Sequence, residues 1–403
     1  MKEISKKENF LRLLFGHSSE ELLNKDKDKS ICTENNYIHI KQLLEADKVN
    51  VNETDENKKT ILHYACLHNK NERLIQLLLK RKANVNLIDN DEQTPLHISS
   101  ANITNVNIFK LLLEYKAKIN GRDVANRTPL HIAVLNDNEN VIQYLIDHGA
   151  DVNAKEKDSK TPLHVVMETD NEKMVEILLK NGANVNEVDD FLDTPLHFAS
   201  MNCNEKIIKN LLENGADVNA IDEVSRTALH YASGDNTNEK VVKMLIDYRA
   251  DVRVFDDNLL TPLHFACEGN KNEKVIQCLL ENSADVNAVD DMLMTPLHVA
   301  CSENTNDKIT SCLLKYHAKV NATSKHMLTP LHHASLNNPN PNVTRALLEH
   351  QANIHARNSK SRTPLHLACY SCNLKVVRVL LEYKANVNAY DNNFRSPLHD
   401  LLH

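Results

Sequence analysis

A four-residue phrase, Thr-Pro-Leu-His, recurs along most of this chain of 403 residues at almost constant spacing. Eight copies are exact and three are close variants, and each begins 33 or 34 residues after the one before it. The copies begin at residues 60, 94, 128, 161, 194, 227, 261, 295, 329, 363 and 396. Self-similarity at a period of about 20–50 residues is typical of proteins in which one small unit is stacked many times. The length of the chain therefore measures the number of units, not the number of separate globular domains.

The rest of each unit repeats as well and predicts two short helices joined to a hairpin loop. Thr precedes Pro at the helix start, where its side-chain oxygen is expected to cap free amides and the missing N–H of Pro is not needed. An apolar stripe with helical spacing follows, for example at residues 175–179, and then an extended phrase such as residues 150–153 and a polar tip. Neither helix is long enough to be stable alone, so each must bury its apolar face against neighbouring units.

Composition excludes several classes of function. The chain has seven glycines, whereas average usage of about 7% would give roughly 28, so it lacks the glycine-rich loops that cradle phosphates. Its formal net charge of −8 disfavours nucleic-acid binding, and no apolar run approaches the roughly 18 residues that cross a bilayer. Nine scattered cysteines do not resemble a disulfide framework and favour a cytoplasmic, reducing setting. We therefore expect no nucleic-acid partner, no membrane insertion and no small-molecule substrate.

The period, the phrase Thr-Pro-Leu-His-x-Ala, the Leu-Leu stripe and the phrase Ala-Asp-Val-Asn together resemble the ankyrin-repeat family. The resemblance extends over residues 34–403. It implies an all-α, right-handed solenoid of stacked antiparallel helix pairs, with β-hairpin loops that project to one side. It also implies a function, because members of this family are overwhelmingly non-catalytic scaffolds that bind other proteins.

The repeat pattern divides the chain into four parts. Residues 1–33 are expected to form an N-terminal cap helix and a charged linker, and residues 34–59 resemble a degenerate half repeat. Residues 60–395 form ten ankyrin repeats, and residues 396–403 begin a truncated or capping repeat. Because a solenoid needs capped ends, this last segment leads to the hypothesis that the natural protein continues past it.

The chain has 21 histidines, but their pattern indicates a structural role. One ends each phrase, where its imidazole can tie the helix start to nearby backbone. These motif histidines are His63, His97, His131, His164, His197, His230, His264, His298, His332 and His366. Cys369 and Cys372 have C-x-x-C spacing, yet Cys369 shares a repeat position with Cys66, and no second such pair completes a four-ligand site. Acid pairs such as Asp256 and Asp257 fall at hairpin tips, where they form turns and stay solvated. We therefore expect no catalytic residue, no metal site and no cofactor.

Asparagine and other residues stand where ankyrin units usually have glycine. Asn304 and Asn338 lie between the two helices of a unit, and asparagine tolerates the left-handed backbone conformation. After the second helix, residues such as Lys116 and Arg249 replace glycine, at up to about 1 kcal/mol each if the left-handed cap is kept. The Asn of the Ala-Asp-Val-Asn phrase resembles the acceptor of asparaginyl hydroxylation in this family, but we expect a structural role in the hairpin turn.

The most unusual feature lies at the hairpin tips, just before each phrase. The first four tips are polar, whereas the central tips are apolar. Ankyrin tips usually carry Asp-Gly and are exposed, so an apolar row across stacked tips would be a patch of the kind that marks an interaction site. The alternative is that these side chains fold back and pack on adjacent hairpins. The predicted partner-binding residues are Phe191, Leu192, Phe255, Leu259, Leu260, Met292, Leu293, Met294, Met327 and Leu328.

Charge also varies along the tips. Asp257 and Asp291 make the central tips acidic, whereas Lys325 and Lys360 make the last tips basic. A partner with apolar anchors and a graded charge would suit this surface.

We expect a scaffold or adaptor that binds a protein partner, of unknown identity, through the hairpin tips and the concave face of the inner helices. The alternative is that the chain is the ankyrin-repeat portion of a larger protein. Such a protein would be a channel, a ubiquitin-ligase adaptor, a toxin, or an effector of an intracellular parasite or virus that is delivered into a host cell.

Overall fold

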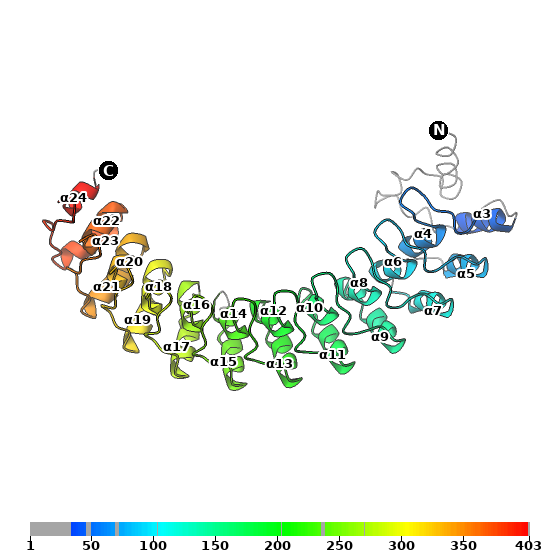
Figure 1. Cartoon of the computed structure of the whole chain (residues 1–403), viewed down its shortest axis with the longest axis horizontal. Helices are drawn as coiled ribbons and strands as arrows, with labels where there is room; N and C mark the ends of the chain where they lie inside the picture. Colours follow the sequence, from blue (N-terminus) through cyan, green and yellow to red (C-terminus); the bar gives the residue numbers. More distant parts are fainter. Residues whose placement is uncertain are drawn as a thin grey trace. The chain divides into compact units, whose positions relative to one another are not determined.

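The computed structural model describes seven stretches of the chain, and every regular element within them is an α-helix (Figure 1). The described residues are 34–45, 50–68, 72–102, 104–202, 204–234, 238–269 and 271–401. The predicted N-terminal helix and linker of residues 1–33 lie outside them. The chain divides into two compact units, one ending at Asp190 and the other beginning at Phe191. The predicted all-α stack of helix pairs is confirmed within each unit.

In the first unit, helix α3 (Glu34–Glu45) precedes four helix pairs. The first helices of successive pairs pack on one another, and so do the second helices. The first helices are α4 (Ile61–His68), α6 (Pro95–Asn102), α8 (Pro129–Leu135) and α10 (Pro162–Val166), and the second are α5 (Glu72–Lys80), α7 (Val106–Glu114), α9 (Glu139–Asp147) and α11 (Glu172–Lys180). Leu130 and Ile142 are fully buried between the two layers, which places the core there.

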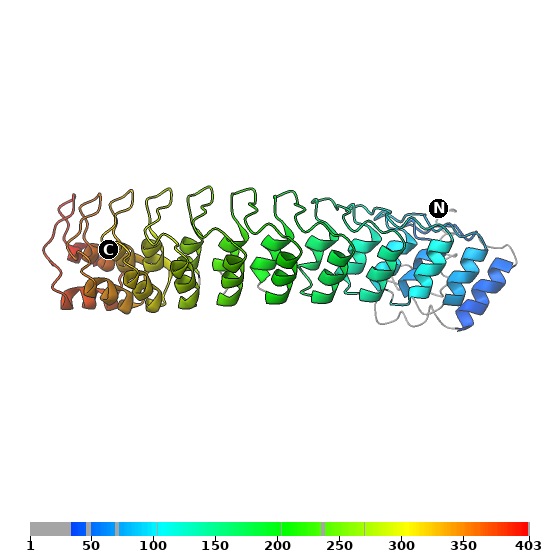
Figure 2. The ribbon, with the colours of Figure 1, turned by 90° about the horizontal axis from the view of Figure 1, so that it is seen from below.

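The second unit repeats this arrangement. Its first helices are α12 (Pro195–Asn202), α14 (Ala228–Ser233), α16 (Pro262–Glu268), α18 (Pro296–Glu303), α20 (Pro330–Asn337), α22 (Pro364–Tyr370) and α24 (Pro397–Leu401). Its second helices are α13 (Glu205–Glu213), α15 (Glu239–Asp247), α17 (Glu273–Glu281), α19 (Asp307–Lys315), α21 (Pro341–Glu349) and α23 (Leu374–Glu382). Within this unit the loops before the first helices project to one side (Figure 2). They reverse direction through turns, but no described residue belongs to a β-strand, so these hairpins form no sheet.

Each first helix begins with a hydrogen-bonded pair formed by the Thr and His of the phrase. The backbone N–H of Thr261 donates to Nδ1 of His264 at 3.1 Å, and the Thr261 hydroxyl lies 2.9 Å from the same nitrogen. Because a backbone N–H can only donate, Nδ1 carries no hydrogen and the ring hydrogen is on Nε2. The same contacts recur in all ten phrases from Thr60 to Thr363. The Thr oxygen contacts the imidazole and also caps the helix start as expected, because the N–H of His332 donates to the Thr329 hydroxyl oxygen at 3.4 Å and completes a reciprocal capping box.

The other ring nitrogen joins each unit to the next. Nε2 of His264 lies 3.2 Å from the carbonyl oxygen of Met294, and Nε2 of His298 lies 3.1 Å from that of Leu328. Both carbonyls belong to the tip that precedes the next Thr-Pro phrase. All ten motif histidines are buried, and each of these bonds couples a helix start to the position of the neighbouring tip.

The Asn of the Ala-Asp-Val-Asn phrase makes a second link between units. Asn86 donates from Nδ2 to the Lys116 carbonyl at 3.0 Å, and its Oδ1 accepts the N–H of Lys118 at 2.8 Å. The same two bonds are made by Asn120, Asn153, Asn219 and Asn321. Where Arg253 replaces Asn, its Nε donates to the Ser283 carbonyl at 2.9 Å. The expected structural role of this Asn is confirmed.

The left-handed caps after the second helices are kept without glycine. The φ angle is 69° at Lys116 and 71° at Arg249, compared with 95° at Gly149. A non-glycine residue in this conformation costs roughly 1–2 kcal/mol. The expectation that these positions hold a strained cap is therefore confirmed.

The asparagines between the helices have a different role from the predicted one. Asn304 and Asn338 are extended, with φ angles of −93° and −90°. Asn306, two residues after Asn304, is the N-cap of α19, and its side chain accepts the N–H of Lys308. The prediction of left-handed asparagine at these loops was wrong, because the free amides of the second helix recruit the side-chain oxygen of an extended residue.

The buried histidines predict a strong dependence of stability on pH. Burial lowers the pKa of His131, His230, His298 and His332 to about 4, whereas an unfolded histidine has a pKa of about 6.5. Between these values the unfolded chain binds more protons, so the free energy of unfolding should fall as the pH falls. The slope is up to about 1.4 kcal/mol per pH unit for each such histidine. Urea unfolding measured from about pH 7 to about pH 5 checks this, and a constant midpoint would contradict it.

Candidate functional site

Each hairpin tip of the central repeats is built around one buried polar side chain. At Asp256, which is 1% exposed, Oδ1 accepts the backbone N–H groups of Asn258 and Leu260 at 2.9 Å each. The N–H of Asp256 donates to the Leu260 carbonyl, which closes the turn. Oδ1 of Asp222, Asp290 and Asp391 accepts two such N–H groups in the same way. We expected both acids of a pair to stay solvated. This is wrong for Asp256, which is buried and shapes the turn, and it is confirmed for Asp257, which is exposed.

The apex residue of each tip, three positions after this polar residue, has a left-handed backbone. The φ angle is 60° at Leu259, 56° at Leu293 and 56° at Met327. This conformation costs roughly 1–2 kcal/mol for a residue other than glycine, and bulky side chains are rare in it. Glycine at these apex positions would remove the cost, so the tips hold large apolar side chains on a strained backbone.

These apex side chains are exposed to solvent, by 43% at Leu259, 46% at Leu293 and 54% at Met327. Seven of the ten residues predicted to bind a partner are exposed, namely Phe191, Leu192, Phe255, Leu259, Met292, Leu293 and Met327. The other three, Leu260, Met294 and Leu328, are half-buried. The predicted residues therefore differ in exposure, and those that border hollows are divided between two of them.

Two residues of the exposed set border one hollow. Phe255 and Leu259 line a hollow of about 320 Å³ together with Val289. Val289 and Ile221 are exposed apolar residues that the sequence did not single out, although they share the repeat position of Phe255. Phe394, at the apex of the last described tip, is also exposed and was also missed. All three could have been found from the sequence, because each occupies the same position in its repeat as a residue that had been identified: Val289 and Ile221 match Phe255, and Phe394 matches Leu259.

The inner face of the tips meets the first helices. Leu260 and Met294 line a hollow of about 210 Å³ with Phe265 and Val299, which lie on α16 and α18. The carbonyl oxygen of Leu260 is bound by Nε2 of His230, so this face is positioned by the histidine of the preceding unit.

Neighbouring tips in the second unit are joined by backbone hydrogen bonds. The N–H of Asp291 donates to the Asn258 carbonyl at 3.0 Å, and the N–H of Lys325 donates to the Met292 carbonyl at 2.9 Å. Equivalent bonds link the tips before and after these two. The row of tips is therefore held in a defined register before any partner binds.

The exposed charges of the tips change sign along this row. Asp257 and Asp291 are exposed and acidic, whereas Lys325 and Lys360 are exposed and basic. Arg362, close to Lys360 in the sequence, is half-buried, and its Nε lies 3.3 Å from Oδ2 of Asp391.

Comparison with known families explains the repeat. A family model described as ankyrin repeats, three copies to a match, fits residues 29–123, 74–156, 120–189, 154–222, 186–256, 229–324 and 297–391. Together these matches extend over residues 29–391, far more than half of the chain. The chain belongs to the ankyrin-repeat family. No curated protein gave a match.

Ankyrin repeats are generally modules for protein–protein interaction, and the family is typically non-catalytic. Among the residues described by the structure, no group of three or more His, Cys, Asp or Glu is arranged to hold a metal ion. In the same residues, no helix is both long and apolar enough to cross a membrane. In the C-x-x-C pair, Cys369 is buried in α22 and Cys372 is exposed, and both thiols are free.

The strained ankyrin tips predict that replacement by glycine stabilises the fold. Leu259→Gly, Leu293→Gly and Met327→Gly should each raise the free energy of unfolding by about 0.5–1 kcal/mol, because relief of the left-handed strain exceeds the entropy lost by glycine. Urea unfolding of each variant measures the change. A fall in stability would show instead that these side chains pack on adjacent hairpins, which is the alternative that the sequence left open.

Proposed function

We propose that this ankyrin-repeat chain is a non-catalytic scaffold or adaptor that binds a partner protein through the tips and inner-helix face of its second unit. The observation that carries the proposal is the row of large apolar side chains at the left-handed apex positions. Leu192, Leu259, Leu293 and Met327 are exposed there, on a backbone that favours glycine. An exposed apolar row that lowers stability is explained by binding, since exposed patches of this kind mark interaction sites.

The comparison between the two units supports this interpretation. In the first unit the apex positions have the same conformation, with φ angles of 59° at Lys58, 57° at Glu92 and 60° at Ser159. Their side chains are polar, so in the first unit the same strained backbone does not expose apolar side chains. The fold alone therefore does not require leucine or methionine at the apex.

The order already present in the tips supports tight binding. Backbone bonds between tips and the bonds from motif histidines hold the apolar residues in place, so little conformational entropy remains to be lost on association. The acidic and basic ends of the row would orient the partner.

The proposal also includes the number of repeats and the cellular compartment. We infer ten complete repeats over residues 60–395, with partial units on either side, as the binding scaffold. The seven cysteines among the described residues all carry free thiols, which supports a reducing, cytoplasmic compartment.

Loss of the apex side chains should abolish capture of the partner. The chain that carries Leu259→Gly, Leu293→Gly and Met327→Gly should recover at least about tenfold less partner from extracts of its native cells, since a few buried apolar anchors carry most interface energy. Quantitative mass spectrometry of affinity eluates measures the ratio to the unmodified chain.

The matched control carries Lys58→Gly, Glu92→Gly and Ser159→Gly, which relieve the same strain at polar tips. This control should capture the partner as the unmodified chain does. Equal capture by both triple variants would contradict the proposed role of the apolar tips.

A further inference from the structure

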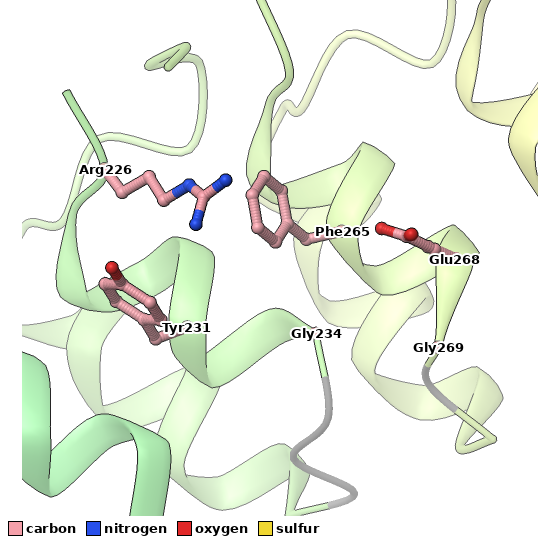
Figure 3. Close-up of a pocket in the computed structure, with 6 residues that line it drawn as sticks. All are labelled: Arg226, Tyr231, Gly234, Phe265, Glu268 and Gly269. Carbon is pink, nitrogen blue, oxygen red and sulfur yellow. The ribbon is translucent and has the colours of Figure 1, made fainter. Parts of the chain in front are cut away.

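A second binding feature lies between α14 and α16, on the inner-helix face of the second unit. A hollow of about 420 Å³ is bounded there by Arg226, Tyr231 and Phe265, and by Gly234, Glu268 and Gly269 (Figure 3). Its volume falls within the range of about 300–1,000 Å³ that is usual for ligand pockets.

Two of the seven glycines in this chain line this hollow, and neither has the positive φ angle at which glycine is favoured. Gly234 has a φ angle of −74° and Gly269 has one of −110°, so neither is left-handed. At the repeat position of Gly234, other first helices carry side chains that range from Ala101 and Ser302 to Met201, Leu336 and Tyr370. A Cβ atom on Gly234 would lie 3.7 Å from Cδ1 of Phe265, which is ordinary contact. The glycine therefore keeps space open that a larger side chain would fill.

Arg226 forms a fixed, cationic wall of the hollow. Its guanidinium carbon lies 5.2 Å from the centre of the Phe265 ring, and its Nε lies 3.5 Å from Oδ2 of the buried Asp256 (Figure 3). Below it, the Tyr231 hydroxyl donates to Asp222. Burial, together with this hydrogen bond, raises the pKa of Tyr231, so the hydroxyl keeps its proton. A planar cation beside two aromatic rings is a surface on which a further aromatic ring binds well.

The rim of the hollow is negatively charged. Glu268 is exposed, forms no ion pair with any described residue, and also borders the neighbouring hollow that contains Met294 and Glu303. Glu303 is likewise exposed, and its carboxylate accepts a hydrogen bond from Ser302. Since Asp256 already compensates Arg226, these two carboxylates leave the rim with unmatched negative charge.

We propose that this hollow, the aromatic pocket, receives one large aromatic side chain of the partner protein, and that a Lys or Arg close to it in the partner sequence pairs with Glu268 and Glu303. The ring stacks against Arg226 and Phe265 in the space that Gly234 leaves open. This inference rests on the proposed function, because it names the chemistry of the partner on the inner face of the same tips.

The absence of tryptophan from this chain gives a direct test. The probe is the pentapeptide Ser-Trp-Lys-Lys-Ser, whose tryptophan can be excited selectively at the red edge of its absorption. Titration to millimolar peptide should give a saturable blue shift of the emission. Ser-Trp-Glu-Glu-Ser, which carries the opposite charge, should bind at least about tenfold more weakly.

Three variants of the full chain identify the site. Gly234→Leu should abolish the blue shift because the side chain fills the aromatic pocket, whereas Gly234→Ala should retain it. Any backbone strain is common to both variants, so the difference isolates side-chain size, and circular dichroism confirms that both fold. Glu268→Gln should weaken binding by about threefold and reduce its dependence on salt.

The outcomes separate this inference from the proposed function. No saturable shift at millimolar peptide, or equal binding by Gly234→Leu and Gly234→Ala, would overturn the aromatic pocket. The triple glycine variant of the tips should bind the peptide normally. If it also captures the partner normally, the proposed role of the tips fails while the pocket stands.

Discussion

The architecture depends on the position of one buried imidazole in each repeat. Nδ1 of the motif histidine accepts the N–H of the Thr that starts its own helix, and Nε2 binds the tip carbonyl of the next unit, as His264 does with Thr261 and Met294. A single side chain therefore sets both where a helix begins and where the neighbouring hairpin lies. Because Nδ1 accepts a hydrogen bond and Nε2 donates one, only the neutral imidazole that carries its hydrogen on Nε2 fits.

The same bond links stability to the candidate binding surface. The carbonyls that the histidines hold at Leu260, Met294 and Leu328 belong to the apolar tips. A partner that binds there meets a backbone already fixed by buried contacts. Preorganisation of this kind raises affinity because ordering has been completed during folding.

Residues with a left-handed backbone occur at two places in a unit, and their side chains differ in character. At the helix ends, Lys116 and Arg249 bear the strain with charged, solvent-directed side chains. At the central tips, Leu259 and Leu293 bear it with apolar ones. Since the backbone cost is similar, the difference lies in what each position presents to solvent, and the proposed partner surface is based on the apolar side chains at the tips.

The outer and inner faces of the tips offer complementary contacts. Leu259 and Phe255 line a shallow hollow outside, whereas Leu260 lines one inside, next to the carboxylates of Glu268 and Glu303. A segment that crosses a tip would meet apolar anchors on one side and an aromatic pocket with an acidic rim on the other. Such a surface discriminates between partners through charge as well as through area.

Periodicity, together with the resemblance to ankyrin repeats, was sufficient to predict the helix pairs, the all-α class and the left-handed caps, because those features repeat and depend on local residues. It also located the apolar tips. It did not predict that Asp256 is buried inside its turn, that Asn304 is extended, or that Leu259 and Leu260 border different hollows. Those outcomes depend on hydrogen bonds within each turn and on contacts between units that no single repeat contains. The aromatic pocket likewise needed the tertiary structure, because Arg226, Gly234 and Phe265 come together only when α14 packs on α16.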